Sequence, residues 1–481
     1  MIEKYEYRIW LEIHIKLNSI NKLFCQCKNE QEFDDLQANT NVCPVCMGQP
    51  GALPVLNKEP LEKAILLGHA LKCQVNEFSA FDRKSYFYPD LPAGFQITQL
   101  PFPTNWNGLV NFFINNFEDE VEIKIERAHI ENDAGKTIHE WWKWILDYNR
   151  AGTPLVEIVT FPDFTSDEEV VEFLKELQRI ARYNNIWFAD LERWQMRVDV
   201  NISVRKKWET KLGTKVEVKN MNSFWSIKRA IEFEFERQVE LIEKWWSVDQ
   251  ETRWRDDAQK LSYTMRSKED SLDYRYFPEP DLPKLKLEKD YIDEIKQRLV
   301  ESPYSRIKRY KEEYKFNKEY INSLISSHDI NDYFEYMVQN WIDYALAAKW
   351  IVGSVLRFLS DAGTTIADLK FTKEQFISFL KLIQDGKLMD SHAKQVLFEM
   401  KDTGKNPEKI IEEKWLKPID NSEIESIVQQ VLNDNPNAVE DFKNGKMNAV
   451  GFLVGQVMKK SAGKADPKTA KELIEKALSL L

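Results

Sequence analysis

Two side chains near the N-terminus could hold a metal ion or move a proton. Glu12 and His14 lie in the segment Tyr5–Leu17, where apolar or aromatic residues alternate with charged ones. An alternation with a period of two predicts a β-strand that buries one face. Residues two apart project from the same face of a strand, so Glu12 and His14 should share the polar face. The sequence therefore predicts that this strand carries part of an active site.

Later segments supply further carboxylate and amide oxygens. They contribute Glu131, Glu157, and the pair Asp199 and Asn201 of the alternating stretch Met196–Arg205. Each of these residues, taken alone, is more typical of an exposed strand position. If the strands lie side by side, however, several carboxylates and one imidazole form the oxygen-rich site that Mg²⁺ uses beside phosphate groups. The pattern leaves a solvated face and a magnesium site as alternatives.

Four of the five cysteines form two close pairs. Cys25 and Cys27 are followed, after fifteen intervening residues, by Cys43 and Cys46. Two such pairs can place four thiolates around one tetrahedral ion, and zinc is the commonest ion in these sites. Incidental buried thiols are the alternative. Since no open coordination position is implied, we expect a structural zinc, and we expect Cys73 to pack in the core.

The composition limits the class of protein. A chain of 481 residues with 43% hydrophobic and 30% charged residues is typical of a multi-domain globular protein. The N-terminus has no apolar signal core, no stretch resembles a membrane span, and grouped cysteines suit a reducing compartment, so we expect a cytoplasmic protein that does not contact a membrane. The net charge of −11 argues mildly against a nucleic-acid partner. Lysine runs at 206–219 and 459–471 are local exceptions, although a solvated face is the alternative explanation.

Several common motifs are missing. The sequence contains no G-x-x-x-x-G-K-[ST] loop, no G-x-G-x-x-G after a strand and no G-x-S-x-G elbow. Any nucleotide must therefore be held by a less common architecture. The chain also offers no nucleophile of the kind that a glutaminase or a protease uses.

The pattern of elements changes along the chain. Strand alternation recurs at 121–126 and 215–219, and helical spacing at Val170–Tyr183, behind a capping box at Ser166. After about residue 290 only helical spacing remains. Strands mixed with helices predict the α+β class. We predict three parts: an α+β catalytic domain over residues 1–295 with a zinc knuckle near 25–46, a helical domain over 296–405, and a small helical tail over 406–481.

Motifs along the whole chain resemble the B subunit of the aspartyl/glutamyl-tRNA amidotransferases. The matching stretches keep the order of that family: Leu11–His14, Gly51–Asn57, Phe81–Asp90, His129–Lys136, Asp147–Gly152, Val218–Phe224, Gln250–Arg253, Asp273–Asp281, Gly451–Met458 and Gly463–Pro467.

The resemblance implies a fold and a reaction. The fold would be a cradle-like catalytic domain on a mixed or antiparallel sheet, then a helical domain and a tail that binds tRNA. The reaction would use ATP and Mg²⁺ to phosphorylate the side-chain carboxylate of Glu-tRNA(Gln), Asp-tRNA(Asn) or both, after which ammonia displaces the phosphate. Ammonia would come from an amidase (glutaminase) partner, the A subunit, and a small C subunit would complete the complex.

The resemblance also assigns residues to these tasks. The catalytic residues would be Glu12, His14, Glu131 and Glu157. The magnesium ligands would be Glu12, His14, Glu131 and Asn132, and the zinc ligands Cys25, Cys27, Cys43 and Cys46. The substrate and nucleotide pocket would include Lys84, Tyr86, Tyr88, Asp199, Asn201, Lys219 and Asn220. The tRNA would contact Lys459, Lys460, Lys464 and Lys468.

Two departures from the family pattern stand out. Asn132 replaces a glutamate, which removes one negative charge and should weaken Mg²⁺ binding. Tryptophan also stands at positions where the family has glycine, and the chain holds 16 glycines against 15 tryptophans. The positions are Trp10, Trp194, Trp208, Trp245, Trp246 and Trp415. We interpret these tryptophans as UGA codons that the source decodes as glycine but that are translated as tryptophan in this sequence. Genuine divergence is the alternative. At position 10, an indole would crowd the face that carries Glu12.

Three other functions are alternatives. An archaeal-type relative specific for Glu-tRNA(Gln) usually carries a large synthetase-like insertion, for which 481 residues leave no room. A non-catalytic tRNA-binding scaffold with a decayed active site would account for Asn132 and Trp10. A ligase acting on a small carboxylate is disfavoured by the basic tail.

Overall fold

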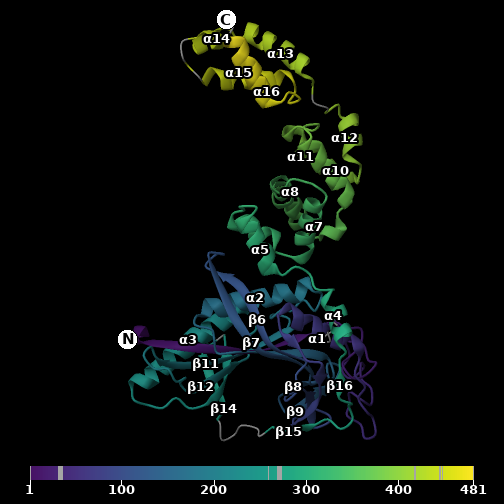
Figure 1. Ribbon diagram of the computed structural model, residues 1–481, viewed down its shortest axis with the longest axis vertical. Helices are drawn as coiled ribbons and strands as arrows, with labels where there is room; N and C mark the ends of the chain where they lie inside the picture. Colours follow the sequence, from purple (N-terminus) through teal and green to yellow (C-terminus); the bar gives the residue numbers. More distant parts are fainter. Residues whose placement is uncertain are drawn as a thin grey trace. The chain divides into compact units, whose positions relative to one another are not determined.

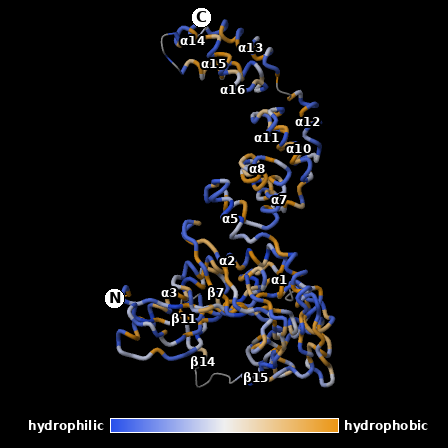
Figure 2. Tube along the Cα trace, viewed as in Figure 1, coloured by the Kyte–Doolittle hydropathy of each residue, from blue (hydrophilic) through white to orange (hydrophobic). Residues whose placement is uncertain are grey.

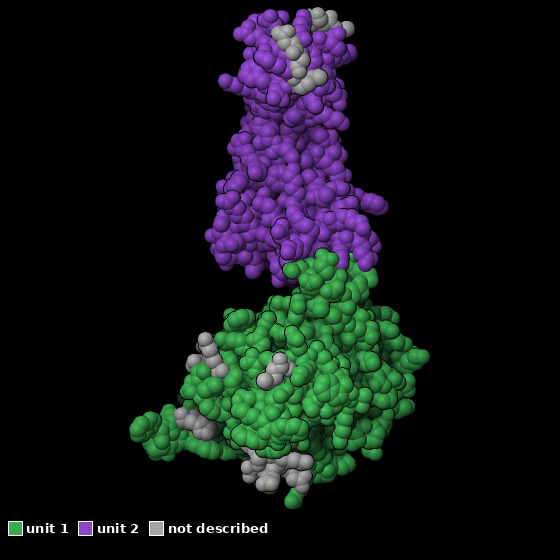
Figure 3. Space-filling model, turned by 90° about the vertical axis from the view of Figure 1, so that its left-hand side faces the viewer, with its two compact units in different colours: residues 1–309 green, residues 310–481 purple. Residues whose placement is uncertain are grey.

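The computed structural model describes residues 2–30, 36–257, 259, 261–267, 274–416, 419–443, 446 and 448–479. The chain forms two compact units, residues 1–309 and 310–481, which Figure 3 shows in different colours. The first unit combines sheets with helices and the second is helical, so the predicted α+β class is confirmed. Within the described residues, no helix has both the length and the apolar character that crossing a membrane requires.

A nine-stranded sheet runs through the first unit, and strand β1 lies in the middle of its strand order (Figure 1). The strand order is β14-β13-β12-β11-β1-β10-β7-β6-β2, and every neighbouring pair is antiparallel except β12 with β13. The strands are β1 (Tyr5–Lys16), β2 (Gln74–Val75), β6 (Asn105–Ile114), β7 (Asp119–Asn132), β10 (Pro154–Thr160), β11 (Met196–Lys206), β12 (Lys215–Lys219), β13 (Glu251–Asp256) and β14 (Leu261–Ser267).

Strand β1 separates an apolar face from a polar one. The odd-numbered side chains of Ile9–Ile15 are fully buried, whereas Glu12 and His14 face the other side and stay partly exposed. Pairing with β10 on one side and β11 on the other sets His14 opposite Glu157 and Glu12 opposite Asp199. The alternation predicted from the sequence is therefore confirmed.

Three helices cover the apolar face: α1 (Lys58–Ala70), α2 (Asp167–Tyr183) and α3 (Phe224–Glu243). Their inward residues share one core with the odd-numbered residues of β1, and hydrophobic residues concentrate where α1 and α2 meet the sheet (Figure 2). Helix α2 begins at the predicted cap, where the Glu169 N–H donates to the Ser166 hydroxyl at 3.1 Å. Because the helices occupy one face, functional side chains can gather only on the other.

A smaller sheet supplies side chains to the polar face. Its strands are β15 (Arg275–Pro278), β4 (Asp82–Ser85) and β5 (Phe95–Thr98), in that order, and β5 packs on β7. The remaining elements are η1 (Ile2–Lys4), β3 (Phe78–Ser79) with β16 (Leu285–Lys286), the hairpin β8 (Lys136–Glu140) and β9 (Lys143–Asp147), α4 (Lys289–Lys296) and α5 (Pro303–Glu312). Residues 296–309, which the sequence assigned to the helical domain, belong to the first unit.

The second unit contains short helices. They are α6 (Lys318–Leu324), α7 (His328–Gln339), α8 (Tyr344–Trp350), η2 (Ile351–Val355), α9 (Leu356–Ala362), η3 (Ile366–Asp368), α10 (Lys373–Gln384), α11 (Asp390–Thr403), α12 (Pro407–Glu413), α13 (Asn421–Asp434), α14 (Pro436–Lys443), α15 (Asn448–Lys460) and α16 (Pro467–Ser479). Helix α12 packs on α10 and α11, whereas α13–α16 share a separate core.

The predicted boundary between the second and third parts falls in a short turn, residues 404–406, between α11 and α12. The side-chain amide of Gln375 donates to the Gly404 carbonyl oxygen at 2.9 Å and so fastens the turn to α10. The core of the last four helices begins at Ile424. The change of core therefore falls after α12, not at residue 406.

Four tryptophans adopt a backbone conformation that favours glycine. Their φ angles are +57° at Trp194, +60° at Trp245, +67° at Trp341 and +56° at Trp415. This left-handed region costs a residue with a Cβ about 1–2 kcal/mol. The four side chains are 48% to 93% exposed, so packing of the indole offsets little of that cost.

Three of these tryptophans end helices in the same way. After α3, the Trp245 N–H donates to Ile242 O and the next N–H donates to Leu241 O, and Trp341 and Trp415 repeat this pair of bonds after α7 and α12. The pattern is the Schellman motif, whose left-handed residue is usually glycine. After α10, Gly386 makes the same bonds with φ at +69°. The geometry supports the interpretation of positions 245 and 415 as glycine codons. It adds position 341 to the tryptophans that stand where glycine is favoured.

We expect Trp245→Gly and Trp415→Gly each to stabilise the chain by roughly 0.5–1 kcal/mol, because relief of the left-handed strain exceeds the added backbone entropy. Thermal and urea unfolding of the full chain would measure the change. Trp225→Gly is the matched control: Trp225 is 62% exposed but lies within α3. This control should destabilise the chain by roughly 0.5 kcal/mol, because glycine is a poorer helix former than tryptophan. Destabilisation by all three substitutions would contradict the glycine interpretation.

The gene itself gives an independent check. We expect UGA at codons 10, 194, 208, 245, 246, 341 and 415, and UGG at codon 350, whose tryptophan is buried within α8. Sequencing the gene measures this directly. A UGG codon at 245, 341 and 415 would show that the tryptophans are genuine.

Candidate active site

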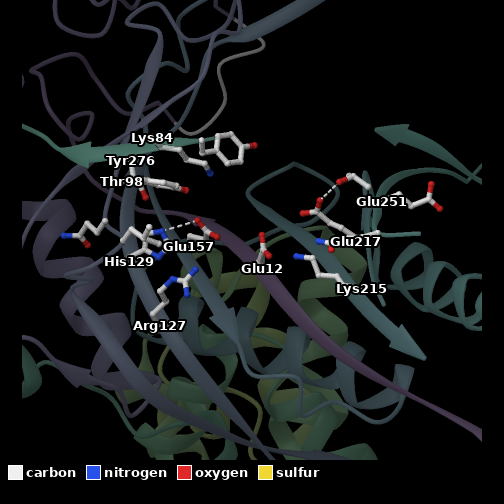
Figure 4. Close-up of a pocket in the computed structure, with 15 residues that line it drawn as sticks. Glu12, Lys84, Thr98, Arg127, His129, Glu157, Lys215, Glu217, Glu251 and Tyr276 are labelled. Atoms are coloured by element: carbon white, nitrogen blue, oxygen red, sulfur yellow. Dashed lines mark hydrogen bonds and ion pairs between the residues drawn. The ribbon is translucent and has the colours of Figure 1, made fainter. Parts of the chain in front are cut away.

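A cavity of about 370 Å³ opens on the polar face of β1 and is lined by both sheets (Figure 4). Most of its lining residues are charged or polar: Glu12, Lys84, Thr98, Gln99, Leu100, Arg127, His129, Glu157, Lys215, Glu217, Gln250, Glu251, Thr252, Tyr274 and Tyr276. Ligand sites are usually apolar with a few polar groups. The lining here suits a highly charged ligand instead.

A triad of His14, Glu131 and Glu157 adjoins this cavity. The Nε2 atom of His14 is 3.1 Å from Glu131 Oε1 and 3.7 Å from Glu157 Oε2. On the next strand, His129 Nε2 is 3.1 Å from the same Glu157 oxygen. Strand pairing explains the cluster, because Glu157 of β10 lies opposite His14 of β1 on one side and His129 of β7 on the other.

The triad concentrates negative charge in a buried place. Glu131 is 1% exposed and Glu157 is 8% exposed. Burial raises the pKa of Glu157, but His129, His14 and Lys84 bring that pKa well below its ordinary value. Burial lowers the pKa of His14, whereas Glu131 and Glu157 raise it, and the net shift is upward. One ligand atom from each triad residue lies within 4.8 Å of the others, so the donor set fits a divalent cation such as Mg²⁺.

A second acidic group lies beside the first. Glu12, Asp199 and Glu217 each place one carboxylate oxygen within 4.8 Å of the others, and Lys219 pairs with both Asp199 and Glu217. The Asn201 amide donates to Glu12 Oε1 at 3.2 Å. Burial and neighbouring carboxylates raise the pKa of Glu12. The predicted residues Asp199, Asn201 and Lys219 therefore meet around Glu12.

The smaller sheet adds a cation to these carboxylates. Lys84 of β4 lines the cavity, and its Nζ lies 4.7 Å from the centre of the Tyr274 ring. Burial lowers the pKa of Lys84, but Glu131 and Glu157 raise it above its ordinary value. Lys84 therefore carries its charge next to the triad. Tyr86 packs edge-on against Tyr274 at 5.4 Å, behind the lining.

Two other predicted pocket residues lie outside the lining. Tyr88 is 50% exposed and does not border the cavity. Asn220 follows β12, and its side-chain amide donates to the Arg255 carbonyl oxygen at 3.1 Å. This hydrogen bond joins the end of β12 to β13, and Asn220 does not line the cavity.

Asn132 points away from the triad. Its Oδ1 accepts a hydrogen bond from the Ile97 N–H at 2.7 Å, and its side chain lines a second cavity of about 240 Å³. Neighbours in a strand project to opposite faces, so Asn132 cannot join Glu131 at one metal ion. The prediction of Asn132 as a magnesium ligand is wrong. Its neutral amide does not lower the charge of the triad.

Several lining residues were not predicted from the sequence. Glu217 alternates with Lys215 and Lys219 in β12, so the same argument that placed Glu12 could have found it. Thr98 and Tyr276 carry no such signal. They reach the cavity only because β5 and β15, far apart in the sequence, both pair with β4.

Trp10 lies on the polar face, as predicted. It stands opposite Asn201 in the register, and its ring centre is 5.7 Å from the ammonium nitrogen of Lys215, a lining residue. The indole is half-buried there. A glycine at this position would leave that space next to Glu12 free.

The four predicted zinc ligands come together. One sulfur atom from each of Cys25, Cys27, Cys43 and Cys46 lies within 4.8 Å of the others. The Cys43 and Cys46 sulfurs are 3.8 Å apart. Tetrahedral zinc with Zn–S bonds of about 2.3 Å requires a sulfur–sulfur distance of about 3.8 Å. The cluster could therefore bind a metal such as zinc.

The lysines predicted to bind tRNA lie at the end of α15 and the start of α16. Lys459, Lys460 and Lys468 are exposed, and Lys464 is half-buried. Lys460 also pairs with Asp434 at 2.7 Å. Three of the four predicted lysines are therefore exposed at this end of the helix pair.

Comparison with known proteins identifies the family. Residues 7–293 match the family model of the GatB/GatE catalytic domain, and residues 332–478 match that of the GatB domain. The chain belongs to the family of amidotransferase B subunits. Two relatives are named as the B subunit of aspartyl/glutamyl-tRNA(Asn/Gln) amidotransferase. The one from Caldicellulosiruptor saccharolyticus is 43% identical to this chain over 99% of both chains. The one from Persephonella marina is 43% identical over 99% of this chain and all of the relative. The one from Clostridium tetani is 40% identical over 99% of each.

Family membership establishes the general activity. The chain is one component of a tRNA-dependent amidotransferase, a ligase-type enzyme that forms a carbon–nitrogen bond with glutamine as the amide donor. The family model of the catalytic domain covers every residue of the cavity lining. The amidotransferase B subunit therefore carries its charged cavity within the domain that defines the family.

We expect Glu131→Gln and Glu157→Gln to weaken Mg²⁺ or Mn²⁺ binding at least about tenfold, because each removes a charged oxygen ligand. Asn132→Asp is the control. It adds a negative charge one residue away but on the opposite face, so affinity should stay within about twofold. Isothermal titration of the full chain would measure all three. Clearly tighter binding by Asn132→Asp would restore Asn132 as a ligand.

Proposed function

We propose that the cavity on the polar face of β1 uses ATP to activate the side-chain carboxylate of Glu-tRNA(Gln), Asp-tRNA(Asn) or both, in the cytoplasm. One observation carries this proposal: the triad of His14, Glu131 and Glu157 adjoins a cavity that also holds the ammonium of Lys84. A divalent cation and a fixed ammonium group are the partners that a triphosphate needs during phosphoryl transfer.

The reaction proceeds in two balanced steps. A carboxylate oxygen of the mischarged amino acid takes the terminal phosphoryl group of ATP, and ADP leaves. Ammonia then attacks the acyl carbon, the bond from carbon to the phosphate oxygen breaks, and the nitrogen loses a proton to give the amide. Phosphorylation is required because direct attack on a free carboxylate would have to expel an oxide ion, which is a very poor leaving group, whereas phosphate leaves readily.

The residues of the chain bind and orient these groups. His14, Glu131 and Glu157 would hold Mg²⁺, which when bound neutralises phosphate charge. Lys84 would contact phosphate oxygens. Glu12, whose pKa is raised by burial and by nearby carboxylates, would hold the proton that the attacking nitrogen releases.

Asp199, Asn201 and Lys219 surround Glu12, and we assign them to the substrate. The Oδ1 atom of Asn201 is buried without a hydrogen-bond partner among the described residues, although its amide nitrogen is bonded to Glu12. An unpaired buried oxygen of this kind is an acceptor that a bound ligand can satisfy.

Ammonia would come from a separate amidase (glutaminase) partner, the A subunit, with a small C subunit in the same complex. The relatives are named as B subunits, which implies that further subunits exist. The cavity lining, within the described residues, contains neither cysteine nor serine. A nucleophile for glutamine hydrolysis would then lie on the partner.

The tail lysines would contact the backbone of the mischarged tRNA. Lys459, Lys460, Lys464 and Lys468 offer ammonium groups to phosphates, an interaction that weakens steeply with salt. The zinc held by Cys25, Cys27, Cys43 and Cys46 would be structural.

In the complex with its partner subunits, we expect Glu157→Gln to lower ADP formation with mischarged tRNA at least about a hundredfold. Binding of the tRNA should change less than about threefold, since the tail is untouched. Asn132→Asp serves as the control and should keep the parent rate. Parallel assays of ADP release, amide formation and tRNA binding measure these values.

The scaffold alternative gives a different result in the same assays. If the unmodified complex binds mischarged tRNA but releases no ADP and forms no amide, the chain acts as a tRNA-binding scaffold. The neutral Asn132 no longer favours that alternative, because it lies on the opposite face of β7 from the triad.

A further inference from the structure

A fully buried lysine lies against the cysteine cluster. Lys22 has an exposed fraction of 0%. Its Nζ donates to the Asn41 carbonyl oxygen at 2.8 Å and lies 3.8 Å from the Cys46 sulfur. Lysine side chains usually extend to place the ammonium in water. Here the ammonium is enclosed, so its charge must be balanced inside the protein.

The neighbours of Lys22 leave one candidate for this balance. Within the described part of the chain, no carboxylate forms an ion pair with its ammonium, and the Asn41 carbonyl supplies only a dipole. A buried charge without a partner is strongly unfavourable. The Cys46 sulfur carries a full negative charge once it binds a metal as a thiolate. It is therefore the counter-charge within reach.

The metal site has the opposite imbalance. Four thiolates around one divalent ion carry a net charge of about −2. Cys25 and Cys46 are only 7% and 8% exposed, so water screens this charge poorly. The Cys43 N–H donates to the Cys46 sulfur at 3.1 Å, which helps but adds no charge.

We propose that Lys22 is a positioning residue of the metal site, whose ammonium offsets about half of the net charge of the loaded site and keeps Cys46 on the ion. The proposal rests on metal binding by the four cysteines and is independent of the ATP chemistry proposed above. Lys22 and the loaded cluster depend on each other, since each supplies the counter-charge that the other needs in order to be buried.

The same segment joins the metal site to the catalytic strands. The Leu23 N–H donates to Gly152 O, and the Gly152 N–H donates to Asp133 O, both at 2.9 Å. Asp133 follows directly on β7, and β10 begins two residues after Gly152. Two backbone hydrogen bonds therefore connect the residue after Lys22 to the ends of the strands that carry Glu131 and Glu157.

The test compares two lysine substitutions in the full chain. Lys22→Met removes the charge with little change in shape, and Lys28→Met makes the same change at an exposed lysine of the same knuckle. We expect Lys22→Met to weaken zinc binding about 10–100-fold, as loss of an outer-shell partner does, and Lys28→Met to change it less than about twofold. Competition with a colorimetric zinc chelator measures the affinity, and the charge-transfer band of the cobalt-loaded proteins reports the number of thiolate ligands. Equal zinc affinities and equal cobalt spectra in the two variants would overturn the proposal.

A second measurement needs no substitution and applies even if Lys22→Met does not fold. In the zinc-loaded parent chain, Lys22 should resist an amine-acylating reagent, whereas Lys28 should react. After the metal is removed with a chelator, Lys22 should become reactive at a rate at least about tenfold higher, because its counter-charge is lost. Mass spectrometry of the labelled peptides gives both rates. Equal protection of Lys22 with and without metal would show that packing alone buries it and would refute the proposal.

Discussion

The alternation of side chains along β1 is the constraint on which the rest of the site depends. The odd-numbered residues from Ile9 to Ile15 form the core beneath α1, α2 and α3, so Glu12 and His14 have to face the other way. A slip of one residue in the pairing would bury both polar side chains and expose the apolar ones. Because β1 pairs on both sides, this one orientation also determines which residues of β10 and β11 stand next to Glu12 and His14.

The polar face then gathers carboxylates that repel one another. Strand pairing brings Glu131 and Glu157 to His14, and the contact with His129 and the nearby ammonium of Lys84 reduce the repulsion. Like charges held together in a poorly solvated site are unfavourable unless cations compensate them. This electrostatic condition supports the proposal that one cavity takes both a divalent cation, through its carboxylates, and phosphate groups, through its lysines.

Charge balance and turn geometry govern the outlying parts of the first unit in the same way. At the cysteine cluster, the buried ammonium of Lys22 lies 3.8 Å from the Cys46 sulfur, where it would offset part of the negative charge of four thiolates around a divalent ion. At the end of α3, the left-handed turn at Trp245 is required by the helix-ending hydrogen bonds and not by the indole. In both places the surroundings restrict which side chain can be accommodated. Charge is the restriction at Lys22, and backbone conformation is the restriction at Trp245.

Much of this protein could be predicted from its sequence, because the deciding signals are local. The alternation in β1 placed Glu12 and His14 on one face, and the spacing of Cys25 to Cys46 indicated four ligands for one ion. The tertiary structure decided what no local pattern encodes. It turned Asn132 away from the triad, since adjacent strand residues face opposite sides, and it moved the last change of core beyond residue 406. It also brought Lys84, Thr98 and Tyr276 to the cavity, because strands far apart in the sequence meet in one small sheet through long-range pairing.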